Sequence, residues 1–255
     1  MSGDLALSVK DLKTFFYTNK RCNKAVNGVS FEIRRGKTLG IVGESGCGKS
    51  VTASSIMQLL PRLSRIEEGS ITYHAERGDI PIDQLERDGH EMRAIRGEEI
   101  AMIFQDPMTA LNPVYTIGFQ IEEALKYHTD LDAPARRKRV VELLADMGIP
   151  LPKKRADEYP HEFSGGMRQR AMIAMAMSCN PKILIADEPT TALDVTIQAE
   201  ILALMDRLKR ETGTAVMFIT HDMAVVAQMA DRVVVMFRGN KVEEGPVAQI
   251  FEDPK

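Results

Sequence analysis

The chain has 255 residues, 44% hydrophobic and 27% charged, which is enough to bury the core of one large domain or two small ones. Its 33 Lys and Arg against 36 Asp and Glu give a formal net charge of -3, so no bulk electrostatic attraction to nucleic acid is expected. We find no apolar run of membrane-spanning length and no secretory signal pattern. Cys22, Cys47 and Cys179 are scattered and make neither a disulfide framework nor a zinc knuckle, so a soluble cytosolic protein is expected.

Short apolar runs alternate along the chain with segments of helical period. We predict strands at residues 5–9, 29–33, 38–42, 100–104, 183–186, 215–219 and 232–237. Helices are predicted at 50–60, where Pro61 ends the pattern, and at 197–208, where apolar residues recur on one face at Ile201, Leu204, Met205 and Leu208. Continuous apolar strands that alternate with helices are typical of a mostly parallel, helix-covered sheet, which predicts an α/β core.

The middle third of the chain changes to a helical pattern. Ile117, Ile121 and Leu125 share one predicted helix face within this region. We therefore predict a single domain whose core, at about 1–106 and 179–255, is split by a helical insert at about 107–178. The basic run 136–139 is interpreted as a solvated helix face, with a phosphate-binding patch as the alternative.

A glycine-rich loop lies between the predicted strand 38–42 and the predicted helix 50–60. Residues 43–50 read Gly-Glu-Ser-Gly-Cys-Gly-Lys-Ser, which fits the P-loop pattern G-x4-G-K-[ST]. The glycines let the backbone fold around phosphate oxygens, and the helix that follows offers its positive end to the same anion. Lys49 is expected to reach the β- and γ-phosphates of ATP, and Ser50 to bind Mg²⁺. A purely structural glycine turn is the alternative. The predicted nucleotide-binding residues of this loop are Gly43, Glu44, Ser45, Gly46, Cys47, Gly48, Lys49, Ser50 and Val51.

Two acids end the predicted strand 183–186. Carboxylates at the end of a buried strand are costly unless positive charge lies nearby, and a magnesium nucleotide supplies that charge. Asp187 then fits the role of a metal ligand, direct or through water. Glu188, which strand geometry should turn to the other side, is the candidate general base. The alternative is that both acids merely cap the next helix.

Four further segments narrow the class of P-loop protein. Residues 164–170 read Ser-Gly-Gly-Met-Arg-Gln-Arg, Gln105 lies in a Phe-Gln-Asp-Pro segment, and Asp194 and His221 follow later. In this order the motifs resemble those of the ATP-binding subunit of an ABC transporter, over about residues 5–250. The resemblance implies a P-loop NTPase (RecA-like) core with a mostly parallel sheet, an N-terminal antiparallel β part and a helical subdomain insert.

The resemblance also assigns roles to the residues of these segments. Gln105 would sense Mg²⁺ or water and link to the helical insert, and His221 would touch the γ-phosphate. Asp194 would meet a partner subunit, although an exposed loop acid is the alternative. The signature segment would bind the γ-phosphate of ATP held by that partner, through Ser164, Gly165, Gly166 and Met167. Adenine would stack on an aromatic side chain about 30 residues before Lys49, and of the three candidates at 15–17 Tyr17 is preferred, with Phe16 next.

The wording of the motifs resembles the dipeptide and oligopeptide importer branch, which also handles nickel. Met167, where the general family usually has glutamine, resembles one of that branch's two paired ATPases and implies a heterodimer, with a homodimer as the alternative. In that branch the chain usually runs on, often into a cysteine-bearing tail that holds an iron–sulfur cluster. Since the sequence ends at Asp253-Pro254-Lys255, neither that cluster nor any substrate preference is carried over.

As a whole, the resemblance implies a peripheral ATPase at the cytoplasmic face of the inner membrane. It would act head to tail with a second ATPase subunit, on two integral permease subunits, and indirectly with an extracytoplasmic solute-binding protein. Glu188, His221, Lys49 and Gln105 would carry catalysis, with Mg²⁺ bound by Ser50, Gln105 and Asp187. The runner-up is a non-transport ABC ATPase that acts on DNA or ribosomes. A third class, a non-hydrolysing ATP-gated clamp, is disfavoured because both Glu188 and His221 are present.

Overall fold

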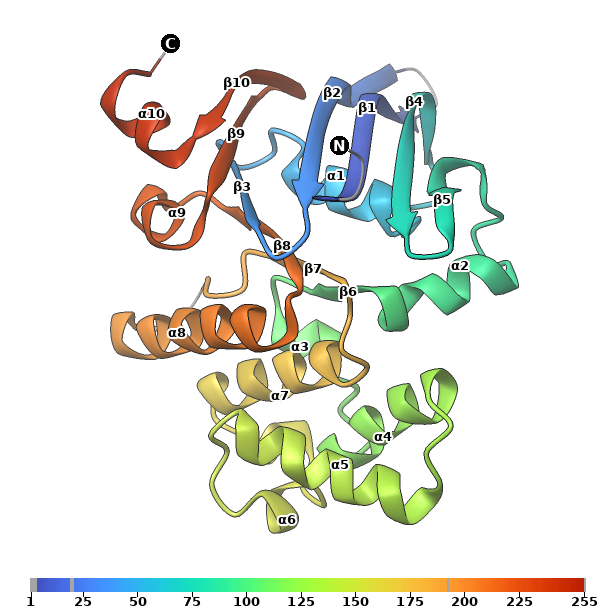
Figure 1. Cartoon of the computed structure of the whole chain (residues 1–255), viewed down its shortest axis with the longest axis vertical. Coiled ribbons are helices and arrows are strands. Elements are labelled where there is room, and N and C mark those ends of the chain that lie inside the picture. Colours follow the sequence, from blue (N-terminus) through green and yellow to red (C-terminus); the bar gives the residue numbers. More distant parts are fainter. Residues whose placement is uncertain (1–3, 19–20, 192, 255) are drawn as a thin grey trace.

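The computed structural model describes residues 4–18, 21–191 and 193–254, which form two sheets and a helical region (Figure 1). A four-stranded antiparallel sheet has the order β2-β1-β4-β5 and a six-stranded sheet the order β10-β9-β3-β8-β7-β6. Within the described ranges, no helix is long and apolar enough to cross a bilayer. The architecture therefore combines the expected antiparallel and mostly parallel β parts.

The antiparallel sheet is built from the N-terminal third of the chain. Its strands are β1 (Leu5–Thr18), β2 (Arg21–Arg34), β4 (Ser64–Ala75) and β5 (Gly78–Pro81). In β1 the consecutive residues from Ala6 to Val9 are all buried, and so is Leu12, so this part of the strand is covered on both faces. The strands at 5–9 and 29–33 are thus confirmed but run much further than their apolar runs. The strands β4 and β5 were missing from the sequence-based prediction.

The six-stranded sheet carries the site at the carboxyl ends of its strands. These are β3 (Thr38–Val42), β6 (Ile100–Ile103), β7 (Ile183–Asp187), β8 (Ala215–Thr220), β9 (Arg232–Phe237) and β10 (Asn240–Pro246). β3 pairs in parallel with β8 and β9, whereas β10 runs antiparallel to β9 at the edge. Parallel strands buried on both faces read as continuous apolar runs, which is why their positions were predicted closely.

The chain outside the helical middle region also forms helices of very different length. They are α1 (Lys49–Ile56), α2 (His90–Ala94), α8 (Val195–Thr212), α9 (Met223–Met229) and α10 (Val247–Glu252), with short turns η2 (Ile82–Gln84) and η3 (Ile95–Glu99). The four apolar residues predicted to share a face of α8 are all buried. α1 ends at Ile56, because Gln58 adopts a left-handed conformation (φ 52°) before the expected stop at Pro61 is reached.

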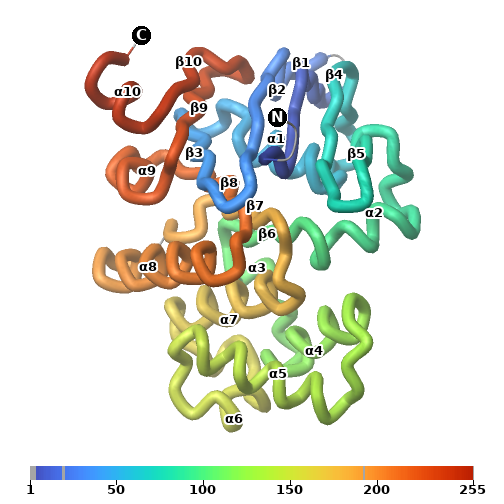
Figure 2. The backbone as a smooth tube through the Cα atoms, in the orientation of Figure 1, coloured from blue at the N-terminus to red at the C-terminus, as the bar shows by residue number. Residues whose placement is uncertain are grey.

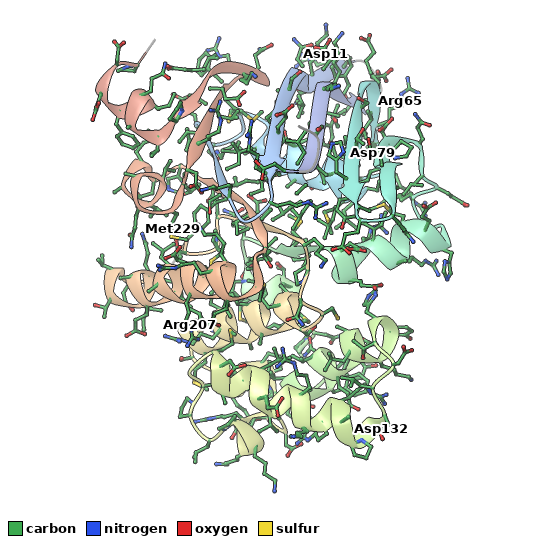
Figure 3. The ribbon with its side chains drawn as sticks, in the orientation of Figure 1. Asp11, Arg65, Asp79, Asp132, Arg207 and Met229 are labelled. Atoms are coloured by element: carbon green, nitrogen blue, oxygen red, sulfur yellow. The ribbon has the colours of Figure 1, made fainter. Side chains whose placement is uncertain are left out.

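The described chain between β6 and β7 is helical and lies at the end of the molecule farthest from the antiparallel strands (Figure 2). It contains α3 (Pro107–Ala110), α4 (Ile117–His128), α5 (Ala133–Asp146), α6 (Pro152–Arg155), the turn η4 (Pro160–Glu162) and α7 (Gly165–Met177). Asp132 caps α5 by accepting from Ala135 N at 2.9 Å, and Arg207 of α8 donates to Asp146 O at 2.6 Å (Figure 3). These helices lie within the range expected for the insert, and the single domain with its split core stays a prediction.

The basic run of α5 is engaged with nearby carboxylates. Arg136 lies 3.3 Å from Glu122, Arg137 donates to Asp157 at 2.6 Å, and Lys138 and Arg139 both approach Glu142. Since each cation already faces an acid of the same region, these contacts favour the solvated-face interpretation over a phosphate patch.

Candidate functional site

The glycine loop follows β3 and leads directly into α1. Gly43, Gly46 and Gly48 all have positive φ, at 150°, 79° and 104°. A Cβ at Gly43 would lie 2.1 Å from Met236 O, and one at Gly48 would lie 2.2 Å from Ala25 O, so both positions require glycine. The loop is therefore shaped by its backbone, as the spacing of the glycines predicted.

Lys49 is the first residue of α1 and is almost fully buried, with 4% of its surface exposed. Its Nζ donates to Gly43 O at 2.7 Å and to Glu44 O at 3.0 Å, and lies 4.0 Å from Cys47 Sγ. Cys47 is buried in the core, and its N–H donates to Glu44 O at 3.2 Å. The lysine thus closes the loop on itself, and the cysteine side chain supports the loop from beneath.

Asp187 ends β7 below the same loop. Its Oδ1 accepts from Ser50 Oγ at 3.0 Å, and only 5% of the residue is exposed. Burial raises the pKa of Asp187, the Ser50 hydrogen bond and Lys49 oppose that rise, and the charge of Glu188 adds to it. Burial thus disfavours the ionised carboxylate more than Ser50 and Lys49 stabilise it, and a bound cation would supply the missing stabilisation.

Glu188 is turned toward the cavity by its backbone rather than by strand alternation. Its φ is 47°, a left-handed conformation that is unusual for a residue with a side chain. Its Oε2 accepts from Gln105 Nε2 at 3.2 Å and from Thr191 Oγ1 at 3.0 Å, and its Oε1 lies 3.4 Å from His221 Nδ1. β6, β7 and β8 therefore deliver Gln105, Glu188 and His221 to one point.

A cavity of about 290 Å³ lies above this cluster. It is lined by Phe16, Asn23, Ala25, Ser45, Gly46, Gly48, Lys49, Ser50, Val51, Gln105 and Glu188. Asp187 reaches it through Ser50 and His221 through Glu188, while Gly43, Glu44 and Cys47 shape the loop behind it. The P-loop, glutamine and acidic-strand residues predicted from the sequence are thus brought together.

The preferred aromatic residue, Tyr17, does not line this cavity. Its hydroxyl donates to Glu67, and the Arg65 guanidinium, labelled in Figure 3, lies 4.8 Å from the centre of its ring. The Glu67 hydrogen bond is the main cause of a raised Tyr17 pKa. Phe16 lines the cavity instead, because neighbouring residues of β1 point to opposite faces. Phe16 therefore replaces Tyr17 as the adenine-stacking candidate.

The signature segment forms a second cavity, of about 400 Å³. Its lining residues are Ser164, Gly165, Gly166, Met167, Arg170, Leu193, Asp194 and Ile197. Ser164 caps α7 by accepting from Met167 N at 3.3 Å, and Asp194 caps α8 by accepting from Ile197 N at 3.0 Å. A Cβ at Gly165 would meet no atom within 4 Å. Asp194 thus joins the signature residues, and these two lining sets have no residue in common.

Residues 26–191 match the family described as ABC transporter. The chain belongs to the ABC transporter family. A putative peptide import ATP-binding protein of Brucella ovis is 53% identical over all of this chain and 75% of its own length. The oligopeptide transport ATP-binding protein OppD of Bacillus subtilis is 52% identical over 98% of this chain and 68% of its own length. A dimeric ATP-binding cassette solved in a post-hydrolysis state with ADP and Pi is 29% identical, with a TM-score of 0.82 over 94% of this chain and 98% of that one.

As an ABC ATPase, the chain binds and hydrolyses ATP, and its fold is that of the family's cassette. Several residues at its cavities escaped the sequence analysis. Asn23 and Ala25 line the P-loop cavity from β2, and Arg170 lines the signature cavity. Thr191 donates to the oxygen of Glu188 that Gln105 also contacts. None of these residues stands out by type, since their positions follow from strand pairing and from the turn after Asp187.

Proposed function

We propose that this ABC ATPase hydrolyses ATP to drive a peptide importer. The observation that supports the chemistry best is the convergence of Lys49, Ser50, Asp187, Gln105 and Glu188 on one cavity. The peptide class is supported by relatives that are 49–53% identical over nearly all of this chain and are named peptide, oligopeptide or dipeptide transport proteins. The transported solute itself is selected elsewhere in such a system.

The functional unit is a head-to-tail dimer with a second ABC ATPase, either a sister subunit or a second copy. Two features support it: the P-loop cavity and the signature cavity share no lining residue, and the solved cassette of similar fold is dimeric. The N–H groups at the start of α7 offer an anion site that the chain's own P-loop cavity does not use. Each signature segment then completes the nucleotide site of the partner.

The residues around Asp187 fit a magnesium ion that is shared with the nucleotide. Its carboxylate, the Ser50 hydroxyl and the Gln105 amide oxygen are hard oxygen ligands, and Mg²⁺ usually takes one or two protein ligands together with phosphate oxygens. Among the described residues, no cluster of three acidic, His or Cys side chains could hold an ion unaided. When bound, Mg²⁺ neutralises charge on the phosphates. Ser50, Asp187 and Gln105 would hold it.

The chemistry assigned to the side chains follows from their contacts. Glu188 acts as general base toward the attacking water, and Gln105, Thr191 and His221 hold its carboxylate in place. Lys49 exchanges its two carbonyl partners for the β- and γ-phosphates and stabilises the charge that develops there. Phe16, which lines the same cavity, stacks on adenine.

Two permease subunits dock at the cytoplasmic face of the membrane, one on each ATPase. A mostly apolar groove of about 270 Å³ between α1, the strand β6 and the helices α4 and α7 supports this assignment. Its lining includes four methionines, Met57, Met102, Met172 and Met175, whose flexible side chains suit a helix laid into a groove. Phe104, next to Gln105, also lines it, so the groove and the nucleotide cavity adjoin along the chain.

The test is to purify the tagged chain from detergent-solubilised membranes of its native host and to identify the proteins that come with it. The proposal expects two multi-spanning proteins and a second ABC ATPase. Recovery with ribosomes or nucleic acid would instead support the non-transport class of ABC ATPase, and would refute the importer.

A further inference from the structure

The P-loop helix α1 ends against a guanidinium. Arg96 donates from Nε to Met57 O at 2.8 Å and from an Nη to Gln58 O at 3.0 Å. Carbonyls at the end of a helix have no partner within the helix and carry the negative end of its dipole. Arg96 therefore fixes the end of α1 that lies opposite Lys49.

The backbone around this contact is sharply bent on both sides. Gln58 is left-handed, and its Nε2 donates to Ile82 O at 2.6 Å. Arg96 has an extended backbone (ψ 120°) and Gly97 a positive φ of 90°, so η3 is broken where the guanidinium projects.

The segment that carries Arg96 connects the P-loop helix α1, the end of α4 and the chain that leads to Gln105. It leads without interruption into β6, and Gln105 follows at the end of that strand. A Cβ at Gly97 would lie 3.0 Å from Nε2 of His128, so the end of α4 rests on this glycine. η3 is thus a junction between the P-loop helix, the helical insert and the glutamine loop.

Arg96 also lines the apolar groove described above, and it is the one charged residue among the described residues that line it. Burial is the main cause of a lowered Arg96 pKa, which Asp88 partly offsets. A guanidinium has five N–H donors, and among the described residues only two of them have partners. An acceptor oxygen that enters the groove can therefore bind Arg96 while the guanidinium still holds α1.

We infer that Arg96 is a positioning residue that transmits occupancy of the groove by a permease segment to the P-loop. This inference rests on the proposed function, which places the permease in that groove. α1 has eight residues, about 12 Å at the rise of an α-helix, and it joins the guanidinium at one end to the phosphate-binding loop at the other. A displacement of Arg96 by the occupant moves α1 as a rigid body, and with it the loop amides and Lys49.

The experiment compares the chain together with its partner ATPase, free of permeases, with the same two ATPases reconstituted in liposomes with the permease subunits. The quantity measured is the coupling ratio, which is kcat/KM for ATP in the transporter divided by kcat/KM for ATP in the permease-free ATPase pair. Arg96→Met removes the donors and keeps an apolar stem of similar length, whereas Arg96→Lys keeps the charge. Arg93→Met is the matched control, because Arg93 is exposed three residues earlier and makes no side-chain hydrogen bond or ion pair with a described residue. Its positive charge contributes only to the lowering of the Arg96 pKa.

We expect Arg96→Met to lower the coupling ratio by about fivefold or more, Arg96→Lys to restore part of it, and Arg93→Met to match the wild type. If Arg96 only caps α1, Arg96→Met will lower the melting temperature and leave the coupling ratio at the wild-type value, which overturns the inference. Should Arg96→Met not fold, Arg96→Lys decides: a wild-type ratio in that variant also overturns it. A wild-type chain that assembles with no permease refutes the proposed function, whereas an assembled and stimulated transporter with unaffected Arg96 variants refutes this inference alone.

Discussion

The replacement of Glu188 by glutamine tests the general base most directly. The side chain keeps its size, and one amide oxygen can accept from both Gln105 and Thr191 as Oε2 now does. The amide nitrogen would then face His221 Nδ1, which lies 3.4 Å from Oε1 and accepts a hydrogen bond in the neutral tautomer that carries its proton on Nε2. The fold and the ATP cavity should therefore survive, so the loss should fall on the chemical step.

A general base contributes about 10²–10⁴-fold to a rate, which corresponds to about 2.7–5.4 kcal/mol of transition-state stabilisation. We expect Glu188→Gln to lower ATP turnover by about that factor, while its affinity for a fluorescent ATP analogue stays within about threefold of wild type. Release of inorganic phosphate at saturating ATP measures the first quantity. Glu211→Gln, which makes the same change at an exposed position of α8, is the control. Near-normal turnover in Glu188→Gln would refute the assignment.

Three further predictions use other parts of the two cavities. Phe16→Ala should weaken ATP binding by about 5–150-fold, which corresponds to the loss of one base-stacking contact, whereas Tyr17→Ala should change it little. An equilibrium titration that finds the reverse order would make Tyr17 the adenine-stacking residue. Because burial raises the pKa of Asp187, the nucleotide-free folded state gains stability as the pH falls from neutral through that raised pKa toward about 4. Asp187→Asn should therefore melt higher than wild type without nucleotide at pH 7, lose this advantage as the pH falls, and gain less stability from ATP with Mg²⁺; a lower melting point at pH 7 would contradict the burial argument. Gly165→Ala should stabilise the first turn of α7 by up to about 1 kcal/mol, since a Cβ there meets no atom, yet reduce turnover if a partner's phosphate occupies that space; unchanged turnover would argue against the head-to-tail site.

Sequence reasoning succeeded where a single physical requirement decides the residue type. The run 38–42 was placed without error as β3, because a strand buried on both faces is apolar throughout and a glycine ends it. The P-loop was recognisable from the spacing of its glycines. The structure gives the physical reason for two of them, since a Cβ at Gly43 or Gly48 would collide with a backbone oxygen. Ser50 Oγ and Asp187 Oδ1 lie 3.0 Å apart, so the two residues predicted to bind Mg²⁺ are neighbours, and that role stays a prediction.

The misses have equally specific causes. β4 carries Glu67, Glu68 and Gly69 in its middle, with register shifts against β1, so its apolar alternation is interrupted. β10 is a polar strand at the edge of its sheet, where one side needs no apolar contact. The choice between Phe16 and Tyr17 depends on which face of β1 each one points to, and counting residues back from Lys49 cannot decide that.

Lys49 is already bound to two carbonyls of its own loop, and this sets a condition on any anion that enters. An incoming phosphate must replace Gly43 O and Glu44 O as the partners of the Lys49 ammonium. The free energy of binding is therefore reduced by the cost of breaking these two hydrogen bonds. A lone phosphate or a monophosphate forms few new bonds in return, whereas a triphosphate can engage the loop amides, the helix end and the lysine together. Because the lysine must leave both carbonyls first, the closed loop favours an anion that forms several bonds at once over a single phosphate.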